Sequence, residues 1–171
     1  MAIRILSLLL LLISNLVSAN DDQFMIGVGD TIVIDVYNEK DLFVRTKVSQ
    51  SGMVRMPLIG SIQVINKTAR QLGEELEVAL LDGYLVHPSV TVSIEQFRQI
   101  YIKGAVKSAG AYDFVFDLTV AQAIAIAGGL KDRASASAWF IIRGPAKERI
   151  KATAESKILP GDTLTIDESI F

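Results

Sequence analysis

The chain has 171 residues without a cysteine, and its 17 Lys and Arg against 19 Asp and Glu give a formal net charge of −2 at pH 7. Because there is no basic excess, nucleic acid is not expected as a partner, nor is strong attraction to anionic lipid headgroups. Without cysteine, the fold depends on its hydrophobic core and not on disulfides. The length fits one domain, or two small domains.

Residues 1–19 have the pattern of a secretory signal peptide. Arg4 supplies a positive charge, residues 5–13 form a largely apolar run, and Val17-Ser-Ala19 offers small residues for cleavage. A membrane-spanning helix needs about 20 apolar residues, so this run is short for an anchor. We therefore expect cleavage after Ala19, and an uncleaved membrane anchor is the alternative.

Segments with alternating apolar and polar residues predict β-strands along the chain. In chain order they are residues 31–37, 44–48, 54–57, 58–65, 89–94, 99–103, 109–116, 138–143 and 161–167. We expect residues 44–48 and 54–57 to be the arms of a hairpin that turns at Ser51-Gly52. Replacing Gly52 by Val should then lower the free energy of unfolding by about 1 kcal/mol or more, if Gly52 has a positive φ.

Two helices are predicted from capping boxes, in which a Thr and a Gln three residues later satisfy free backbone N–H groups. The first begins at Thr68 and ends near Gly83, and the second begins at Thr119 and ends at Gly128-Gly129. Each has one apolar face, made of Leu72, Leu76, Ala79 and Leu80 in the first helix and of Val120, Ala123, Ile124 and Ala127 in the second. Strands and helices in this order predict an α+β fold.

Six motifs follow one another along residues 20–171. They are Gly27-Val-Gly-Asp30; Val48, Gly52, Pro57 and Gly60; Thr68 with Pro88-Ser-Val-Thr-Val92; Ile102-Lys-Gly-Ala-Val106; Gly110-Ala-Tyr112 with Ala127-Gly-Gly129; and Ile158-Leu-Pro-Gly-Asp162. In addition, residues 29–35 and 161–167 are identical at five of seven positions, which alone indicates two similar turns that each lead into a strand. In this order the motifs resemble the polysaccharide biosynthesis/export family, which includes the outer-membrane polysaccharide exporters.

The resemblance implies two domains after the signal peptide. Residues 20–96 would be a polysaccharide export domain with a mixed sheet and a helix, and residues 97–171 would be a β-grasp-like SLBB (soluble ligand-binding β-grasp) domain. The family motifs would supply structural turns at Gly29, Asp30, Gly52, Pro57, Gly60, Gly104, Gly110, Gly128, Gly129, Gly161 and Asp162. The sequence does not identify residues that contact a glycan.

The chain departs from the family pattern in three ways. Many relatives carry a lipid on an N-terminal cysteine, and longer relatives add further ligand-binding units and a helix that lines an outer-membrane pore. This chain has no cysteine and ends at Phe171, soon after one ligand-binding unit. We therefore expect a periplasmic protein that is not a lipoprotein and that uses a separate outer-membrane barrel. The second unit also reads Gly104-Ala-Val106 and Ala109-Gly110, where relatives usually have Gly-Glu-Val and Pro-Gly.

A terminal Phe is common in barrels, but the polar residues Ser169, Asp167 and Thr165 on its face disfavour a barrel here.

No residue pattern predicts an enzyme, a cofactor site or a metal site. His87 is the single histidine and is expected to be structural, and the glutamates of residues 74–77 are expected on a solvated helix face. Asp30 and Asp162 could be paired carboxylates for sugar hydrolysis, but their Gly-Asp context favours turns. Most aromatic residues of the second unit are expected in its core, although aromatic rings can also stack on sugars; they are Tyr101, Tyr112, Phe114, Phe116 and Trp139.

The resemblance also implies a role. The chain would be a non-enzymatic component of a machine that exports exopolysaccharide, for capsule or biofilm matrix, and its copies would form a homo-oligomeric ring around the polymer. Its partners would be the polysaccharide, an inner-membrane polysaccharide copolymerase with its tyrosine kinase, and the separate barrel. The alternative is a monomeric periplasmic glycan-binding module without a transport role, and a glycan hydrolase is a more distant alternative.

Overall fold

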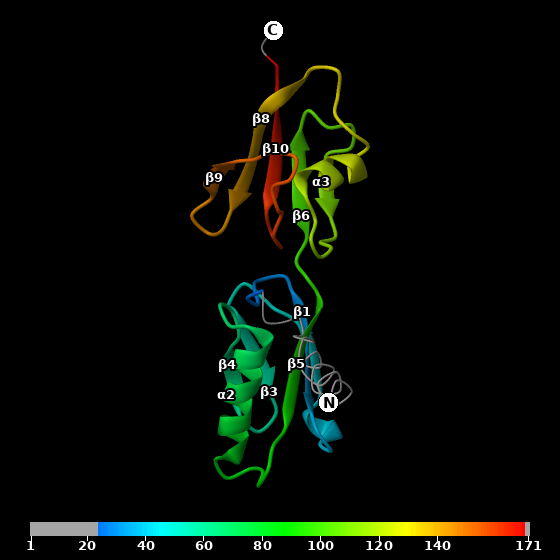
Figure 1. The fold of residues 1–171 in the computed structure, drawn as a ribbon. Helices are drawn as coiled ribbons and strands as arrows, with labels where there is room; N and C mark the ends of the chain where they lie inside the picture. The colour runs from blue at the N-terminus through cyan, green and yellow to red at the C-terminus, as the bar shows by residue number, and fades with distance from the viewer. Residues whose placement is uncertain (1–23, 170–171) are drawn as a thin grey trace, which may run out of the picture.

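The computed structural model describes residues 24–169, which form two lobes stacked end to end (Figure 1). The lower lobe in that view holds the strands before residue 97, and the upper lobe holds the strands from residue 100 onward. Residues 97–99 join β5 (Val90–Gln96) to β6 (Ile100–Gly104) and pass between the lobes. Each lobe has its own cluster of buried apolar side chains. The predicted signal peptide and Phe171 lie outside the described residues.

The lower lobe is built around a three-stranded antiparallel sheet. Its central strand, β1 (Thr31–Val36), pairs with β2 (Val44–Lys47) on one side and with β5 on the other. A 3-10 helix, η2 (Lys40–Leu42), connects β1 to β2. β3 (Met53–Met56) and β4 (Gly60–Gln63) form a separate two-stranded sheet.

Helix α2 (Ala69–Leu81) covers the core of the lower lobe. Its capping box forms as predicted, because Gln71 N donates to Thr68 Oγ1 and Thr68 N donates to Gln71 Oε1. The predicted apolar face is also confirmed, since leucines at successive turns of the helix are buried, namely Leu72, Leu76 and Leu80. Burying a leucine side chain is worth about 1.5–3 kcal/mol, so this face fixes the helix on the sheet.

The predicted hairpin between residues 44–48 and 54–57 is wrong. β2 pairs with β1 and β3 pairs with β4, so the turn at Ser51-Gly52 leads the chain from one sheet to the other. The hairpin closes instead at residues 57–59, where Leu58 has a φ of +67°. A leucine rarely adopts this left-handed conformation, so the sequence does not mark the turn. Pro57, predicted as a turn residue, stands at the start of this turn.

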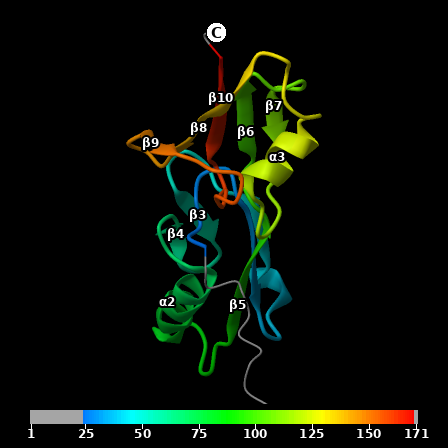
Figure 2. The ribbon, with the colours of Figure 1, turned by 45° about the horizontal axis from the view of Figure 1, so that its top comes forward.

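The upper lobe contains a five-stranded mixed sheet in the order β7-β6-β10-β8-β9. The additional strands are β7 (Gly110–Tyr112), β8 (Ala134–Arg143), β9 (Glu148–Lys151) and β10 (Thr163–Glu168). β10 pairs in parallel with β6 and antiparallel with β8. Helix α3 (Val120–Ile126) lies against one face of this sheet beside β6 and β7 (Figure 2). Within residues 24–169, the mixed sheet of the upper lobe, the antiparallel sheets of the lower lobe and two α-helices confirm the predicted α+β class, and the upper lobe is β-grasp-like.

The sequence predicted α3 better than it predicted the strands around it. The capping box of Thr119 and Gln122 forms, and the four predicted apolar positions of the helix are buried. β7 is shorter than the predicted residues 109–116, and β8 begins at Ala134 rather than Ala138. β9 was not predicted, because its sequence Glu-Arg-Ile-Lys has a single apolar residue.

A pair of glycines with nearly equal φ tests the packing at the turn that leads into β3. Gly52 has a φ of +70° and Gly144 a φ of +69°, but a Cβ at Gly52 would lie 2.7 Å from Ile65 Cδ1, whereas no atom lies within 4 Å of a Cβ at Gly144. Gly144→Val should therefore lower the free energy of unfolding by about 1–2 kcal/mol through backbone strain alone. Gly52→Val should lower it further, by at least about 1 kcal/mol more, because Ile65 must move. Equal losses in urea unfolding would contradict this packing.

Candidate functional site

The first Gly-Asp turn, residues 27–30, folds around the side chain of Asp30. Gly27 N donates a hydrogen bond to Asp30 Oδ2 (2.7 Å), and Asp30 N donates one to Gly27 O (3.2 Å). Gly29 has a φ of +96°, which a residue with a side chain would rarely adopt. Asp30 is fully buried, so its carboxylate requires partners from within the protein.

Arg98, in the segment between the lobes, provides those partners. Its backbone N donates to Asp30 Oδ1 (2.6 Å), and its Nη1 donates to Asp30 Oδ2 (2.8 Å). Hydrogen bonds to an ionised group are about twice as strong as neutral ones. The Asp30 carboxylate therefore ties the start of the lower lobe to the segment that leads into the upper lobe.

A second turn of the same kind, residues 159–162, lies in the upper lobe. Leu159 N donates to Asp162 Oδ2 (2.7 Å), Asp162 N donates to Leu159 O (3.1 Å), and Gly161 has a φ of +84°. Arg143, at the end of β8, binds this carboxylate through Nε to Oδ1 (2.9 Å) and Nη2 to Oδ2 (2.6 Å). The hydrogen bonding to Asp162 raises the pKa of Arg143 above its ordinary value, so the guanidinium stays charged. The internal match in the sequence thus corresponds to two turns with the same hydrogen bonds.

Arg98 lies between the two turns. A Cβ at Gly161 would lie 2.8 Å from Arg98 Nε, and a Cβ at Gly27 would collide with Arg98 Nη1. Glycine at both positions therefore leaves the space that the arginine side chain fills. We call Asp30, Arg98, Gly27 and Gly161 the interdomain clasp.

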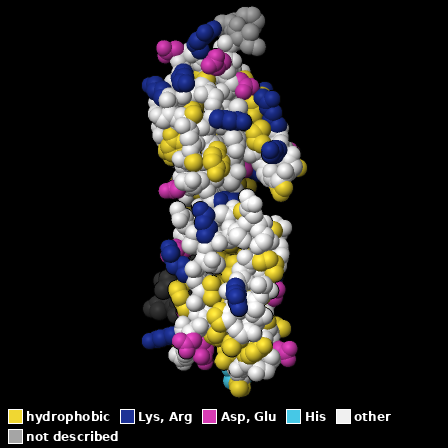
Figure 3. Space-filling model, turned by 180° about the vertical axis from the view of Figure 1, so that it is seen from behind, with side chains coloured by type: hydrophobic (Ala, Val, Ile, Leu, Met, Phe, Trp, Pro, Cys, Tyr) yellow, Lys and Arg dark blue, Asp and Glu magenta, His cyan; other side chains and the backbone are white. Residues whose placement is uncertain are grey.

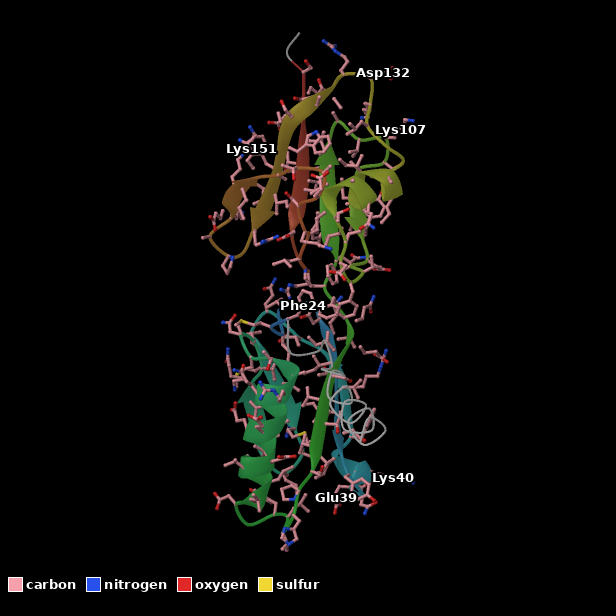
Figure 4. The ribbon with its side chains drawn as sticks, viewed as in Figure 1. Phe24, Glu39, Lys40, Lys107, Asp132 and Lys151 are labelled. Carbon is pink, nitrogen blue, oxygen red and sulfur yellow. The ribbon has the colours of Figure 1, made fainter. Side chains whose placement is uncertain are left out.

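Four phenylalanines pack together at the same junction. They are Phe24, Phe97, Phe114 and Phe116, and their ring centroids are 5.3 to 6.1 Å apart, mostly edge to face. Phe24 lies at the waist between the lobes (Figure 4). Such pairs contribute about 0.5–1.5 kcal/mol beyond the area that they bury. The prediction that aromatic residues fill the core of the second unit is right for Phe114 but not for Tyr101 and Phe116, which are half-exposed.

A cleft of about 930 Å³ lies at the junction. It is lined by both Gly-Asp turns, by residues 96–99, by Arg143 and by Lys47 at the end of β2. The space-filling view shows a narrowing between the lobes, with basic side chains beside it (Figure 3). The cleft has the size of a small-molecule site, for which about 300–1,000 Å³ is typical.

Of the predicted turn residues, Gly29, Asp30, Gly161 and Asp162 meet at the junction, and the others lie elsewhere. Gly52, Pro57 and Gly60 lie around β3 and β4, whereas Gly104, Gly110, Gly128 and Gly129 lie in the upper lobe. Gly104 lies so close to β10 that a Cβ there would collide with Ile166 O. Gly128 and Gly129 have positive φ after α3, and Gly110 lies within β7 without a positive φ.

Sequence reasoning missed Arg98 and Arg143, because no motif surrounds either residue. The one available signal was the repeated Gly-Asp turn, since a buried carboxylate requires a cation or several N–H donors. His87 is exposed in the loop before β5. Within residues 24–169, no three His, Cys, Asp or Glu side chains gather where they could hold a metal ion. No helix in that part of the chain is long and apolar enough to cross a membrane.

Comparisons with known proteins match both lobes. Residues 18–95 match the family described as polysaccharide biosynthesis/export protein, and residues 99–151 match the SLBB domain. The chain belongs to the polysaccharide biosynthesis/export family. The chain is also similar to the exopolysaccharide production protein ExoF of Rhizobium meliloti (strain 1021), with 30% identity over 152 residues. The alignment covers 82% of this chain, but the chain spans only 35% of the length of ExoF.

The two Gly-Asp turns can be placed relative to the segments that match the export family and the SLBB domain. The turn at residues 27–30 lies within the segment that matches the export family, and Arg98 lies between the two matched segments. The turn at residues 159–162 follows the SLBB match in sequence, and its Gly161 packs on Arg98. In this family member, the interdomain clasp therefore connects the export-type lobe to the SLBB lobe.

Removing the guanidinium of Arg98 tests the clasp. Arg98→Met should lower the free energy of unfolding by about 3 kcal/mol, because it leaves the buried Asp30 carboxylate without a cation. The matched control is Arg45→Met, which breaks the exposed ion pair with Glu95 and should cost less than about 1 kcal/mol. Urea unfolding measures both variants, and equal effects of the two arginine substitutions would contradict the clasp.

Proposed function

We propose that this chain is a non-enzymatic periplasmic component of an exopolysaccharide export machine, and that its copies form a ring-like conduit for the polymer. The observation that carries the proposal is the succession of an export-family segment and an SLBB segment in one chain. The similarity to ExoF, a protein named for exopolysaccharide production, supports the same role. We take residues 20–96 as the export domain and residues 97–171 as the SLBB domain, after a signal peptide at residues 1–19.

The interdomain clasp supports assembly into a ring. A closed ring requires one head-to-tail interface with a fixed rotation between neighbouring subunits. A subunit made of two freely moving domains would pay a large entropy cost for such an interface. Because Arg98 binds Asp30 and packs on Gly161, we expect the two lobes to keep one relative orientation before assembly.

The carboxylates that could have served in sugar hydrolysis have structural partners. Asp30 and Asp162 are both buried, and each accepts hydrogen bonds from an arginine and from backbone N–H groups. A general acid must instead present a proton to the leaving oxygen of the substrate. This arrangement favours a structural role and supports a non-enzymatic protein.

The substrate would be the polysaccharide, and the machine would include an inner-membrane polysaccharide copolymerase with its tyrosine kinase. The protein would be secreted into the periplasm without a lipid, and a separate outer-membrane barrel would complete the route. The cleft at the junction favours one other candidate, a monomeric periplasmic glycan-binding module, because a cleft of this size can hold a ligand without any oligomer.

Mass in solution distinguishes the conduit from the module. The full chain, expressed with its own leader and purified from the cell envelope, would be measured by light scattering over a hundredfold dilution series. We expect a discrete multimer that persists on dilution, as a ring subunit requires. A monomer at every concentration would contradict the conduit and favour the module.

A strain that lacks the gene tests the role in export. We expect less polysaccharide in the medium of that strain and recovery when the full chain is restored. Unchanged polysaccharide release would overturn the proposed function.

A further inference from the structure

We propose that the cleft between the lobes binds a carboxylate-bearing sugar unit, with Arg98 and Lys47 as cationic contacts and Tyr101 as an aromatic face. The inference rests on the proposed function, because it takes the ligand to be a glycan, and it adds the chemical class of the sugar. Charge, free hydrogen-bond donors and exposed aromatic surface at the cleft point to this class.

Arg98 has hydrogen-bonding capacity that the clasp does not use. A guanidinium carries five N–H donors. Nη1 donates to Asp30 Oδ2, but within residues 24–169 neither Nε nor Nη2 has an acceptor. The side chain is 30% exposed and lines the cleft. The remaining donors are therefore available to an anionic oxygen, and guanidinium groups bind carboxylates with particular strength.

Within residues 24–169, the cleft also carries a positive charge that no carboxylate balances. Its charged lining consists of Lys47, Arg98, Arg143 and Asp162. Asp162 neutralises Arg143, and Asp30 behind the cleft neutralises Arg98. Lys47 is exposed and forms no ion pair in the described part of the chain. One net positive charge beside unused guanidinium donors favours an anionic ligand over a neutral one.

Tyr101 gives the cleft a surface suited to a sugar ring. It lies on β6, lines the cleft and is 51% exposed, and Met25 beside the first turn is 58% exposed. Exposed aromatic and apolar side chains offer contact to the C–H face of a sugar, while the phenol hydroxyl and the basic groups offer hydrogen bonds. An acidic sugar has both features, an apolar ring face and a carboxylate.

Binding of two short oligosaccharides tests the class of ligand. The full chain, purified from the envelope, would be titrated by calorimetry with tetragalacturonate, which carries carboxylates, and with maltotetraose, which is neutral. We expect tetragalacturonate to bind about tenfold or more tightly, and to lose affinity as the salt concentration rises. Equal affinities, or no binding of tetragalacturonate, would overturn the proposal.

Two matched pairs of variants locate the site. Lys47→Ala should weaken tetragalacturonate binding several-fold, whereas Lys40→Ala, at the far end of the lower lobe, should not (Figure 4). Tyr101→Leu should also weaken it, whereas Tyr84→Leu, which removes an equally exposed tyrosine outside the cleft, should not. Equal effects within either pair would contradict the site. If export needs the protein but tetragalacturonate does not bind, this inference fails and the proposed function stands; if deletion leaves export unchanged, the proposed function itself fails.

Discussion

The buried carboxylate of Asp30 is the constraint on which the arrangement of the two lobes depends. It has no exposed surface, and its oxygens are satisfied by Gly27 N, Arg98 N and Arg98 Nη1. Two of these three donors belong to the segment between the lobes. Burial makes each bond costly to break, because no water replaces a lost donor. The position of Arg98 is therefore fixed by the lower lobe, although the residue leads into the upper one.

In the upper lobe, the turn that packs against Arg98 has the same internal hydrogen bonds as the turn around Asp30. In both turns a glycine with positive φ precedes an aspartate whose side chain accepts from the backbone N–H three residues earlier. The two aspartates differ in their cation, because Asp162 binds Arg143 of its own lobe. Because Gly161 has no side chain, it leaves room for the side chain of Arg98. Together with the four phenylalanines, this packing connects lobes that otherwise have separate cores.

The sequence correctly predicted the structural features that depend on residues close together in the chain. The capping boxes at Thr68 and Thr119 involve residues three apart, and both helices begin where these predict. The pairing of β2 with β1 depends on distant residues, and the β3–β4 turn uses a left-handed Leu58, so the predicted hairpin was wrong. Asp30 was predicted as a turn residue, but its partner Arg98 is 68 positions away and has no motif around it. Predicting that pair requires the fold itself.

A distance measurement between the lobes tests the clasp most directly. Because the chain has no cysteine, spin labels can be attached at Lys40→Cys, at the far end of the lower lobe, and at Lys151→Cys, on the side of the upper lobe at the end of β9 (Figure 4). Double electron–electron resonance on labelled protein diluted with unlabelled protein reports the distribution of distances within one chain. We predict a single narrow distribution that broadens when Arg98→Met is added. A broad distribution before that substitution, or an unchanged narrow one after it, would contradict the role of Arg98 in holding the lobes together.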